Sequence, residues 1–212
     1  MSEPAARTAQ RRVTGSVVAT GKGDDGTTGL LYGGRIAKDD ARAEAYGCID
    51  EAVSCLGIAR AEVAQMGAAG PLPGPLAGLA DTILRLQRDL FVAGAELATN
   101  PEAWDRLRDG ETRVDEAMLS ALEEVLREAE SSVEMPREFI VPGASRLSAA
   151  LDVSRTVVRR AERRVIALDH ARLVPGAWLM PYLNRLADVL WVLARLAEQS
   201  QGVIIEPSRR RG

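Results

Sequence analysis

The stretch VSRTVVRRAERRV, residues 153–165, has the residue types and spacing that could bind a phosphate group. Arg155, Arg159 and Glu162 are separated by four and then three residues, so a helix would place them on one face. The same stretch holds two like-charge pairs at i,i+4 spacing, Arg159 with Arg163 and Arg160 with Arg164. Each pair costs an isolated helix a few tenths of a kcal/mol, which a bound polyanion would offset. A solvated face neutralised by Glu162 and other acids is the alternative.

Residues 20–40, TGKGDDGTTGLLYGGRIAKDD, form a second candidate for phosphate binding. Glycines let backbone N–H groups turn toward an anion, and threonine hydroxyls can donate to phosphate oxygens. The segment fits neither G-x-x-x-x-G-K-[ST] nor G-x-G-x-x-G, and a flexible surface turn would also explain its glycines. It contains the only two lysines, Lys22 and Lys38, among 27 basic residues. That placement favours a compact ammonium group, and hence phosphate, at these positions.

The stretch PYLNRLADVLWVLARL, residues 181–196, has polar residues within an otherwise apolar helix. Asn184, Asp188 and Arg195 lie along one stripe of it. They could lie at the surface or face the arginines of the preceding helix, and the spacing does not decide between the two.

Composition excludes several classes of protein and site. His170 is the only histidine, which excludes a histidine-based metal site or catalytic triad. Cys48 and Cys55 are about 10 Å apart along a predicted helix, too far for a disulfide, so we expect buried free thiols in a reducing cytoplasm. A net charge of −3 argues against a nucleic-acid-binding helical protein, and no apolar run is long enough to span a membrane.

Apolar residues at helical spacing predict five helices, near residues 39–66, 75–98, 112–131, 145–170 and 176–200. Long helices joined by short links predict an all-α fold: an up-down five-helix bundle with an extended glycine-rich N-terminal segment. The whole chain, 1–212, is expected to be one domain, with residues 1–13 and 203–212 as disordered tails. The fourth helix has a 4-3-4-3 seam typical of helix packing, formed by Leu147, Leu151, Ser154, Val158, Ala161, Val165 and Leu168.

The order of these motifs resembles that of the PduO-type ATP:cob(I)alamin adenosyltransferases. The resemblance rests on a T-x-x-G-D-x-G-x-T pattern from Thr20, on RIAKDD, on Y-G-x-x-D-E from Tyr46, on FIVPG, on the arginine stretch and on YLNRLAD. It covers nearly the whole chain. Lys22, Ala144 and Ala187 depart from the residues usual in the family, which leaves the loop geometry near FIVPG and the polyphosphate contacts undecided.

The resemblance implies a homotrimer that binds ATP between adjacent subunits. It makes Arg155 and Asp50 an intersubunit ion pair that orders the site, Arg159 a catalytic residue at the polyphosphate, and Phe139 the aromatic residue that helps displace the corrinoid's lower axial ligand. The residues that it assigns to ATP are Thr20, Gly21, Lys22, Gly23, Thr28, Gly29, Lys38, Arg159, Arg160, Glu162, Arg163 and Asn184.

The implied activity is transfer of the 5′-deoxyadenosyl group of ATP to the cobalt of cob(I)alamin, which gives adenosylcobalamin and triphosphate. Mg²⁺ would be bound mainly through the phosphates of ATP, so no protein metal site is predicted. Implied partners are a cob(II)alamin reductase and an adenosylcobalamin-dependent mutase in the cytoplasm, without nucleic acid or membrane. A non-catalytic carrier or regulator that binds ATP or adenosylcobalamin on the same fold is the alternative.

Overall fold

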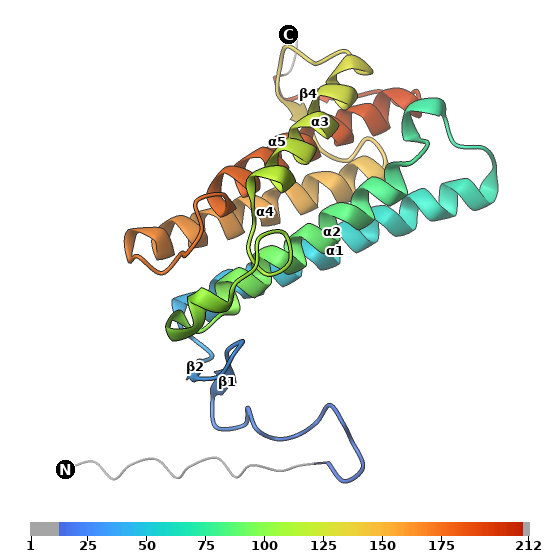
Figure 1. Ribbon diagram of the computed structural model, residues 1–212. Helices are drawn as coiled ribbons and strands as arrows, with labels where there is room; N and C mark the ends of the chain where they lie inside the picture. Colours follow the sequence, from blue (N-terminus) through green and yellow to red (C-terminus); the bar gives the residue numbers. More distant parts are fainter. Residues whose placement is uncertain (1–12, 210–212) are drawn as a thin grey trace.

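The computed structural model describes residues 13–209, and these contain five α-helices that lie side by side (Figure 1). Successive helices run in alternating directions, which confirms the predicted up-down five-helix bundle. Most of the tail predicted at 1–13, and the last three residues of the tail predicted at 203–212, lie outside the described residues. The helices are α1 (Ala41–Ala69), α2 (Leu79–Ala98), α3 (Glu116–Ser131), α4 (Arg146–His170) and α5 (Leu179–Ser200).

Side-chain caps begin three of the helices. Asp40 and Asp115 each accept a hydrogen bond from a backbone N–H in the first turn of α1 and α3. Ser145, the N-cap predicted for the fourth helix, forms a capping box with Ser148. These side chains satisfy N–H groups that a helix cannot pair internally, so the sequence fixes where the three helices start.

Helices α2, α3 and α5 begin about three or four residues later than predicted. Pro75 lies in a short 3₁₀ turn, η1 (Gly74–Leu76), and Gly78 has a φ of +81°. That left-handed conformation is incompatible with a helix, so α2 starts only after it. Residues 173–178 form an irregular link before α5.

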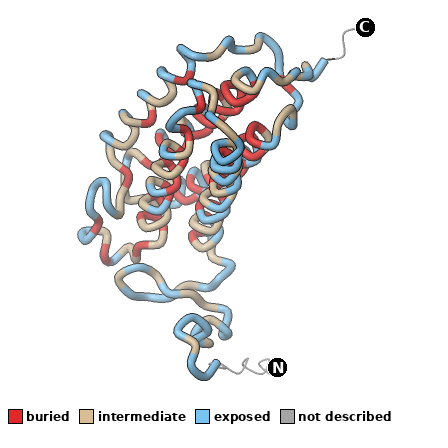
Figure 2. The backbone as a smooth tube through the Cα atoms, turned by 90° about the vertical axis from the view of Figure 1, so that its right-hand side faces the viewer, coloured by how far each residue is buried: buried red, intermediate tan, exposed pale blue. Residues whose placement is uncertain are grey.

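The core lies between the helices, with exposed positions on their outer faces (Figure 2). Helix α4 packs against α1 and α5, α1 also packs against α2, and α5 also packs against α3. All seven residues of the predicted seam of the fourth helix are buried. The seam is therefore confirmed, and it places the flanking arginines of α4 at the edges of its contacts with α1 and α5.

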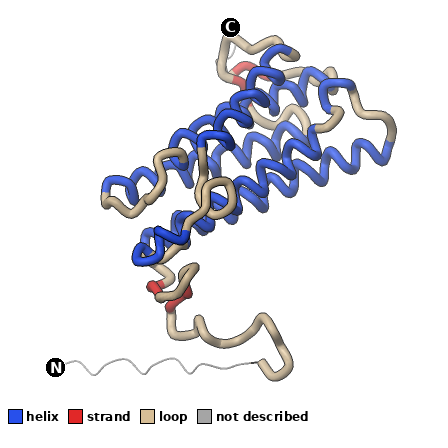
Figure 3. The backbone as a smooth tube through the Cα atoms, in the orientation of Figure 1, coloured by secondary structure: helices blue, strands red, loops and turns tan. Residues whose placement is uncertain are grey.

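The glycine-rich segment forms an extended hairpin that stands off the bundle near the start of α1 (Figures 1 and 3). Its strands, β1 (Thr27–Gly29) and β2 (Arg35–Ala37), are antiparallel. Leu31 joins the hairpin to the end of α2, because its N–H donates to the carbonyl of Ala98 at 2.8 Å and its carbonyl accepts from the N–H of Asn100 at 3.1 Å.

The C-terminal segment differs from the predicted tail within its described part. Strand β4 (Glu206–Pro207) pairs antiparallel with β3 (Ile140–Val141), which lies in the connector between α3 and α4. The prediction of a disordered tail from residue 203 is therefore wrong for residues 206–207. Composition alone could not show this, because a two-residue strand gains its stability from a partner more than 60 residues away.

The remaining structure is a short 3₁₀ helix, η2 (Pro101–Arg106), between α2 and α3. Cys48 and Cys55 are free, and only Cys48 is fully buried. Within residues 13–209, no helix has the length and apolarity needed to cross a membrane.

Candidate functional site

A cavity of about 360 Å³ lies where α4 and α5 meet the end of α3. Three arginines line it, Arg155 and Arg159 from α4 and Arg185 from α5, together with Asp188 and Trp191 of α5. Its positive side chains outnumber its carboxylates, since Asp188 and Glu130 are its two acidic residues. An excess of guanidinium groups in a concave site suits a polyanion such as a polyphosphate.

The arginines of α4 differ in their partners. Arg160 forms an ion pair with Glu51, and Arg164 lies 3.3 Å from the carboxylate of Glu44, both on α1. By contrast, the Arg159 side chain has no hydrogen bond or ion pair among residues 13–209 and faces the cavity. The solvated, acid-neutralised face weighed from the sequence is therefore correct for Arg160 and Arg164, whereas Arg159 is available to a ligand.

The polar residues Asn184 and Asp188 of α5 have different partners. Asn184 Nδ2 donates to Glu162 Oε1 at 3.0 Å, so these two predicted ATP residues lie together across α4 and α5. Asp188 lines the cavity but accepts a hydrogen bond from Arg185 Nη1 at 2.9 Å on its own helix. Both residues are exposed, as the surface alternative expects; of the two, only Asp188 lines the cavity with the α4 arginines Arg155 and Arg159.

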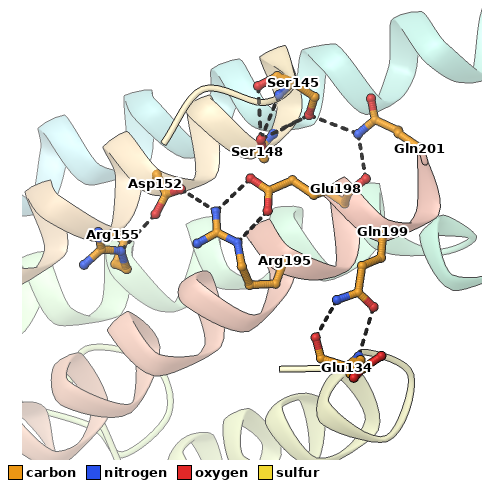
Figure 4. A network of polar contacts seen from close by, with 10 residues as sticks. Glu134, Ser145, Ser148, Asp152, Arg155, Arg195, Glu198, Gln199 and Gln201 are labelled. Atoms are coloured by element: carbon orange, nitrogen blue, oxygen red, sulfur yellow. Dashed lines mark hydrogen bonds and ion pairs between the residues drawn. The ribbon is translucent and has the colours of Figure 1, made fainter. Parts of the chain in front are cut away.

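Arg195 is buried in an ionic network with Asp152 and Glu198 (Figure 4). Its side chain is 1% exposed and donates to Asp152 Oδ2 at 2.8 Å and to Glu198 at 2.6 and 2.9 Å. Burial alone would lower the pKa of Arg195, but the hydrogen bonds to Glu198 and Asp152 outweigh it and raise the pKa above its ordinary value. The other oxygen of Asp152 accepts from Arg155 Nε at 3.1 Å. Asp152 therefore holds a cavity arginine on one side and a core arginine on the other.

Trp191 connects this network with a second hollow. Its ring lies 4.2 Å from the Arg195 guanidinium and 5.4 Å from that of Arg155, both cation–π distances. Trp191 also lines a hollow of about 430 Å³ together with Phe139 and Arg209. Phe139, predicted to act on the corrinoid, is 82% exposed there. Trp191 therefore borders both the arginine-lined cavity and the hollow that contains Phe139.

Asp152, Glu198 and Trp191 were not predicted from the sequence. Asp152 follows Leu151 of the buried seam and precedes Arg155 by three residues, a spacing that allows an ion pair on a helix. A search for the local partner of Arg155 would have found it. The burial of Arg195 had no such signal, because an arginine at helical spacing beside apolar residues is usually exposed.

Arg35 organises the glycine-rich hairpin. It donates to Thr27 Oγ1 at 2.8 Å and to the carbonyl of Lys22 at 2.7 Å, and it lies 3.6 Å from Asp25. Hydrogen bonds from the side chain and backbone of Thr27 hold the pKa of Asp25 below its ordinary value. Lys38 lies over Gly23, where an added Cβ would come within 3.1 Å of Nζ. The hairpin thus brings Gly23 and Lys38 together, as a shared role at a phosphate would require.

The hairpin residues and the α4 arginines do not meet within one chain. None of the predicted residues of this segment lines the α4–α5 cavity: Thr20, Gly21, Lys22, Gly23, Thr28, Gly29 and Lys38. Asp50 is exposed on α1 and borders an apolar hollow of about 460 Å³ with Tyr46 and Phe91. Since Arg155 is paired with Asp152, the predicted ion pair of Asp50 and Arg155 is not formed inside one chain and stays a prediction about two copies.

The carboxylates near the cavity could contribute to an Mg²⁺ ion that is bound mainly by phosphate oxygens. Within the described part of the chain, no three His, Cys, Asp or Glu side chains are grouped so that they could hold a metal. Mg²⁺ usually keeps several waters and takes phosphate oxygens with one or two carboxylates. Asp188 in the cavity and Glu162, one helical turn from Arg159, are carboxylates of this kind.

Comparison with known proteins identifies relatives of this chain. The family model described as cobalamin adenosyltransferase matches residues 18–197. The corrinoid adenosyltransferase of Citrobacter freundii is 37% identical over 186 residues, which cover 88% of this chain and 97% of that protein. The corrinoid adenosyltransferase of Mycobacterium leprae is 38% identical over 200 residues, which cover 90% of this chain and 95% of that protein.

A solved structure has the same fold as this chain. A variant of the PduO-type ATP:corrinoid adenosyltransferase from Lactobacillus reuteri, complexed with cobalamin and ATP, superposes with a TM-score of 0.76. It is 26% identical and is matched over 91% of this chain and 96% of its own. Since the family model spans most of the sequence and relatives above 30% identity match over nearly their full length, this chain belongs to the cobalamin adenosyltransferase family.

Proposed function

We propose that this protein transfers the 5′-deoxyadenosyl group of ATP to the cobalt of cob(I)alamin and releases inorganic triphosphate. The electron pair of reduced cobalt forms the cobalt–carbon bond, and the bond between C5′ and oxygen breaks with its pair on the triphosphate. Because cobalt is the nucleophile, no serine, cysteine or histidine of the protein has to be activated. The protein must orient two large substrates and stabilise charge on the leaving group.

The observation that carries the proposal is the position of Trp191 between two hollows. The cavity with Arg155 and Arg159 suits a polyphosphate, and the hollow with exposed Phe139 suits an apolar face of a large ligand. Two substrates that react with each other need adjoining sites, and here the two hollows share Trp191 as a lining residue. This arrangement supports an enzyme more directly than a carrier, which needs only one of the two sites.

Arg159 is proposed to act at the triphosphate. Its guanidinium has no partner within residues 13–209, so its hydrogen bonds are available for a developing negative charge. Arg155 is proposed to maintain the shape of the site, since Asp152 already holds it. Mg²⁺ bound with ATP would neutralise part of the charge of the phosphates.

We also propose that the protein is a homotrimer in which the hairpin of one subunit completes the cavity of the next. The separation of Gly23 and Lys38 from the α4 arginines within one chain supports this, as does the exposure of Asp50 on α1. In such an assembly Asp50 would pair with Arg155 of a neighbouring copy. A cob(II)alamin reductase and an adenosylcobalamin-dependent mutase are proposed as partners, and the free Cys48 and Cys55 support a cytoplasmic location.

A single assay tests the reaction. Protein, chemically reduced cobalamin, ATP and Mg²⁺ are mixed, the cobalt–carbon product is followed by absorbance, and triphosphate is measured separately. We expect the two products in equal amounts. A protein that binds ATP and adenosylcobalamin without forming either product would be the carrier, and the proposed reaction would be rejected.

A mixing experiment tests the shared site. Lys38→Ala and Arg159→Ala each remove one half of the proposed phosphate site from every subunit. If the halves come from different subunits, exchange between the two inactive variants regenerates some intact sites, and activity rises on mixing. A mixture that stays inactive after demonstrated subunit exchange, or a particle with the 22.8 kDa mass of one chain, would contradict the trimer.

A further inference from the structure

We infer that residues 199–208, the last two residues of α5 and the segment that follows them, are a strap that positions Phe139 for the corrinoid step, with Gln199 and the backbone N–H of Ser208 as its positioning groups. The inference rests on the proposed function, because it gives this segment a role in one half of that reaction. The segment it acts on is the Phe139 loop, residues 132–144, which links α3 to α4.

The strap contacts the Phe139 loop and its end at four places. Gln199 holds the start of the loop with its amide, since Oε1 accepts from the N–H of Glu134 at 2.9 Å and Nε2 donates to its carbonyl at 2.6 Å (Figure 4). Gln201 Nε2 donates to Ser145 Oγ, the cap of α4, at 3.1 Å. Between these two contacts, strand β4 pairs with β3. The loop is thus fixed at its beginning, middle and end.

The fourth contact is at Phe139 itself. The N–H of Ser208 donates to the carbonyl of Phe139 at 2.7 Å. Because the Phe139 side chain is 82% exposed, packing within this chain cannot hold it, and its position depends on the backbone. The hydrogen bond from Ser208 therefore restrains the backbone of Phe139 directly.

The pairing of β3 and β4 also sets which side chain faces the Trp191 hollow. Successive residues of a strand point to opposite faces, so buried Ile140 and exposed Phe139 lie on opposite sides. Phe139 lines the hollow with Trp191, whereas Ile140 borders a different hollow with Ile205. A shift of one residue would exchange the two side chains. The register with Glu206 and Pro207 thus keeps Phe139 in the hollow.

A proline substitution removes the hydrogen bond at Phe139. Ser208→Pro deletes the N–H donor, and Ser208→Ala keeps it. Ile204→Pro is the matched control, because Ile204 is 84% exposed and its N–H makes no hydrogen bond with the described residues. Gln199→Met provides a second, independent variant, since it keeps the length of an exposed side chain and removes both bonds to Glu134.

Two corrinoids separate positioning from general damage. Turnover is measured with cobalamin and with cobinamide, which has no lower nucleotide base to displace, and the loss of the lower ligand from cob(II)alamin is followed by absorbance. We expect Ser208→Pro and Gln199→Met to reduce ligand loss and cobalamin turnover about tenfold, equivalent to about 1.4 kcal/mol. Turnover of cobinamide and affinity for ATP should be unchanged. Ile204→Pro should behave as wild type with both corrinoids, and Ser208→Pro is compared with Ser208→Ala, which keeps the N–H.

Two results would contradict the proposed positioning role of the strap. Equal losses with cobalamin and cobinamide would show a general structural role, and wild-type spectra in both Ser208→Pro and Gln199→Met would show that the contacts do not position Phe139. A wild-type protein without turnover of either corrinoid would instead reject the proposed function, which the cobinamide arm distinguishes from failure of the strap.

Discussion

Glu96 is a buried acidic residue that lies against two other parts of the chain. It lies on α2, its side chain is fully buried, and its Oε2 accepts a hydrogen bond from the N–H of Val114 at 2.8 Å. Its other oxygen faces Gly176 in the link between α4 and α5, where a Cβ would not fit. Burial raises the pKa of Glu96 from 4.5 to about 7, although the hydrogen bond from Val114 and the charge of Arg113 oppose the rise.

This raised pKa makes stability depend on pH. The folded protein keeps the Glu96 proton between pH 4.5 and about pH 7, where the unfolded chain has lost it. The stabilisation is complete below pH 4.5 and is lost as the pH rises through 7. The difference between a pKa of about 7 and 4.5 corresponds to about 3 kcal/mol, of which about 2 kcal/mol falls between pH 5 and pH 8.

Glu96→Gln removes the titration and keeps an oxygen that can accept from Val114. We expect the free energy of unfolding of the wild type to decrease by about 2 kcal/mol more than that of Glu96→Gln between pH 5 and pH 8. Urea unfolding of both proteins at several pH values measures this difference. Glu128→Gln, at an exposed acid, is the control and should follow the wild type. Parallel curves for the wild type and Glu96→Gln would show that Glu96 is ionised in the folded protein at neutral pH and would refute the reasoning.

Three further predictions concern the site. Arg159→Ala should lower turnover about 100-fold through loss of one electrostatic contact to the leaving group. Arg164→Ala, at a helix position outside the cavity, should leave turnover unchanged. Near-normal triphosphate release by Arg159→Ala would contradict the assignment. Arg195→Ala should destabilise the fold by about 3–5 kcal/mol, because it leaves the buried carboxylate of Glu198 without a cationic partner and Asp152 with Arg155 alone. A change below 1 kcal/mol in urea unfolding would mean that the network is dispensable. Gly23→Ala should weaken ATP binding, measured by calorimetry, because the new methyl group displaces the Lys38 ammonium; unaltered affinity would separate the hairpin from the nucleotide.

The helical framework could be predicted because its signals are local. The buried seam of α4 follows from the spacing of apolar residues, and the start of α4 follows from Ser145. The late start of α2 could not be predicted, because a helical pattern does not show that Gly78 adopts a left-handed conformation. The pairing of β3 with β4 was missed for another reason: it joins distant short segments that carry no strand pattern of their own.

Charge and spacing were enough to select Arg155 and Arg159 as candidates, and both line the cavity, but their roles stay predictions. Residues that matter through their burial, such as Asp152, were missed. The sequence could not separate Arg159 from Arg160, since the two differ only in the helix that each faces: Arg160 reaches an acid on α1, and Arg159 reaches the cavity. Which neighbour an arginine meets is set by packing between helices, and a single sequence does not record it.

Arg155 and Arg159 of α4 suit two different tasks at the proposed site. On α4, Asp152 lies one turn before Arg155 and is fixed from behind by Arg195, so the guanidinium of Arg155 is held before any ligand arrives. A group that is already oriented loses little conformational entropy on binding, and a group without a partner loses no existing bond. Arg155 has the first property and Arg159 the second. Since an ion pair cannot orient a guanidinium without also occupying part of it, the two tasks require two arginines, one helical turn apart.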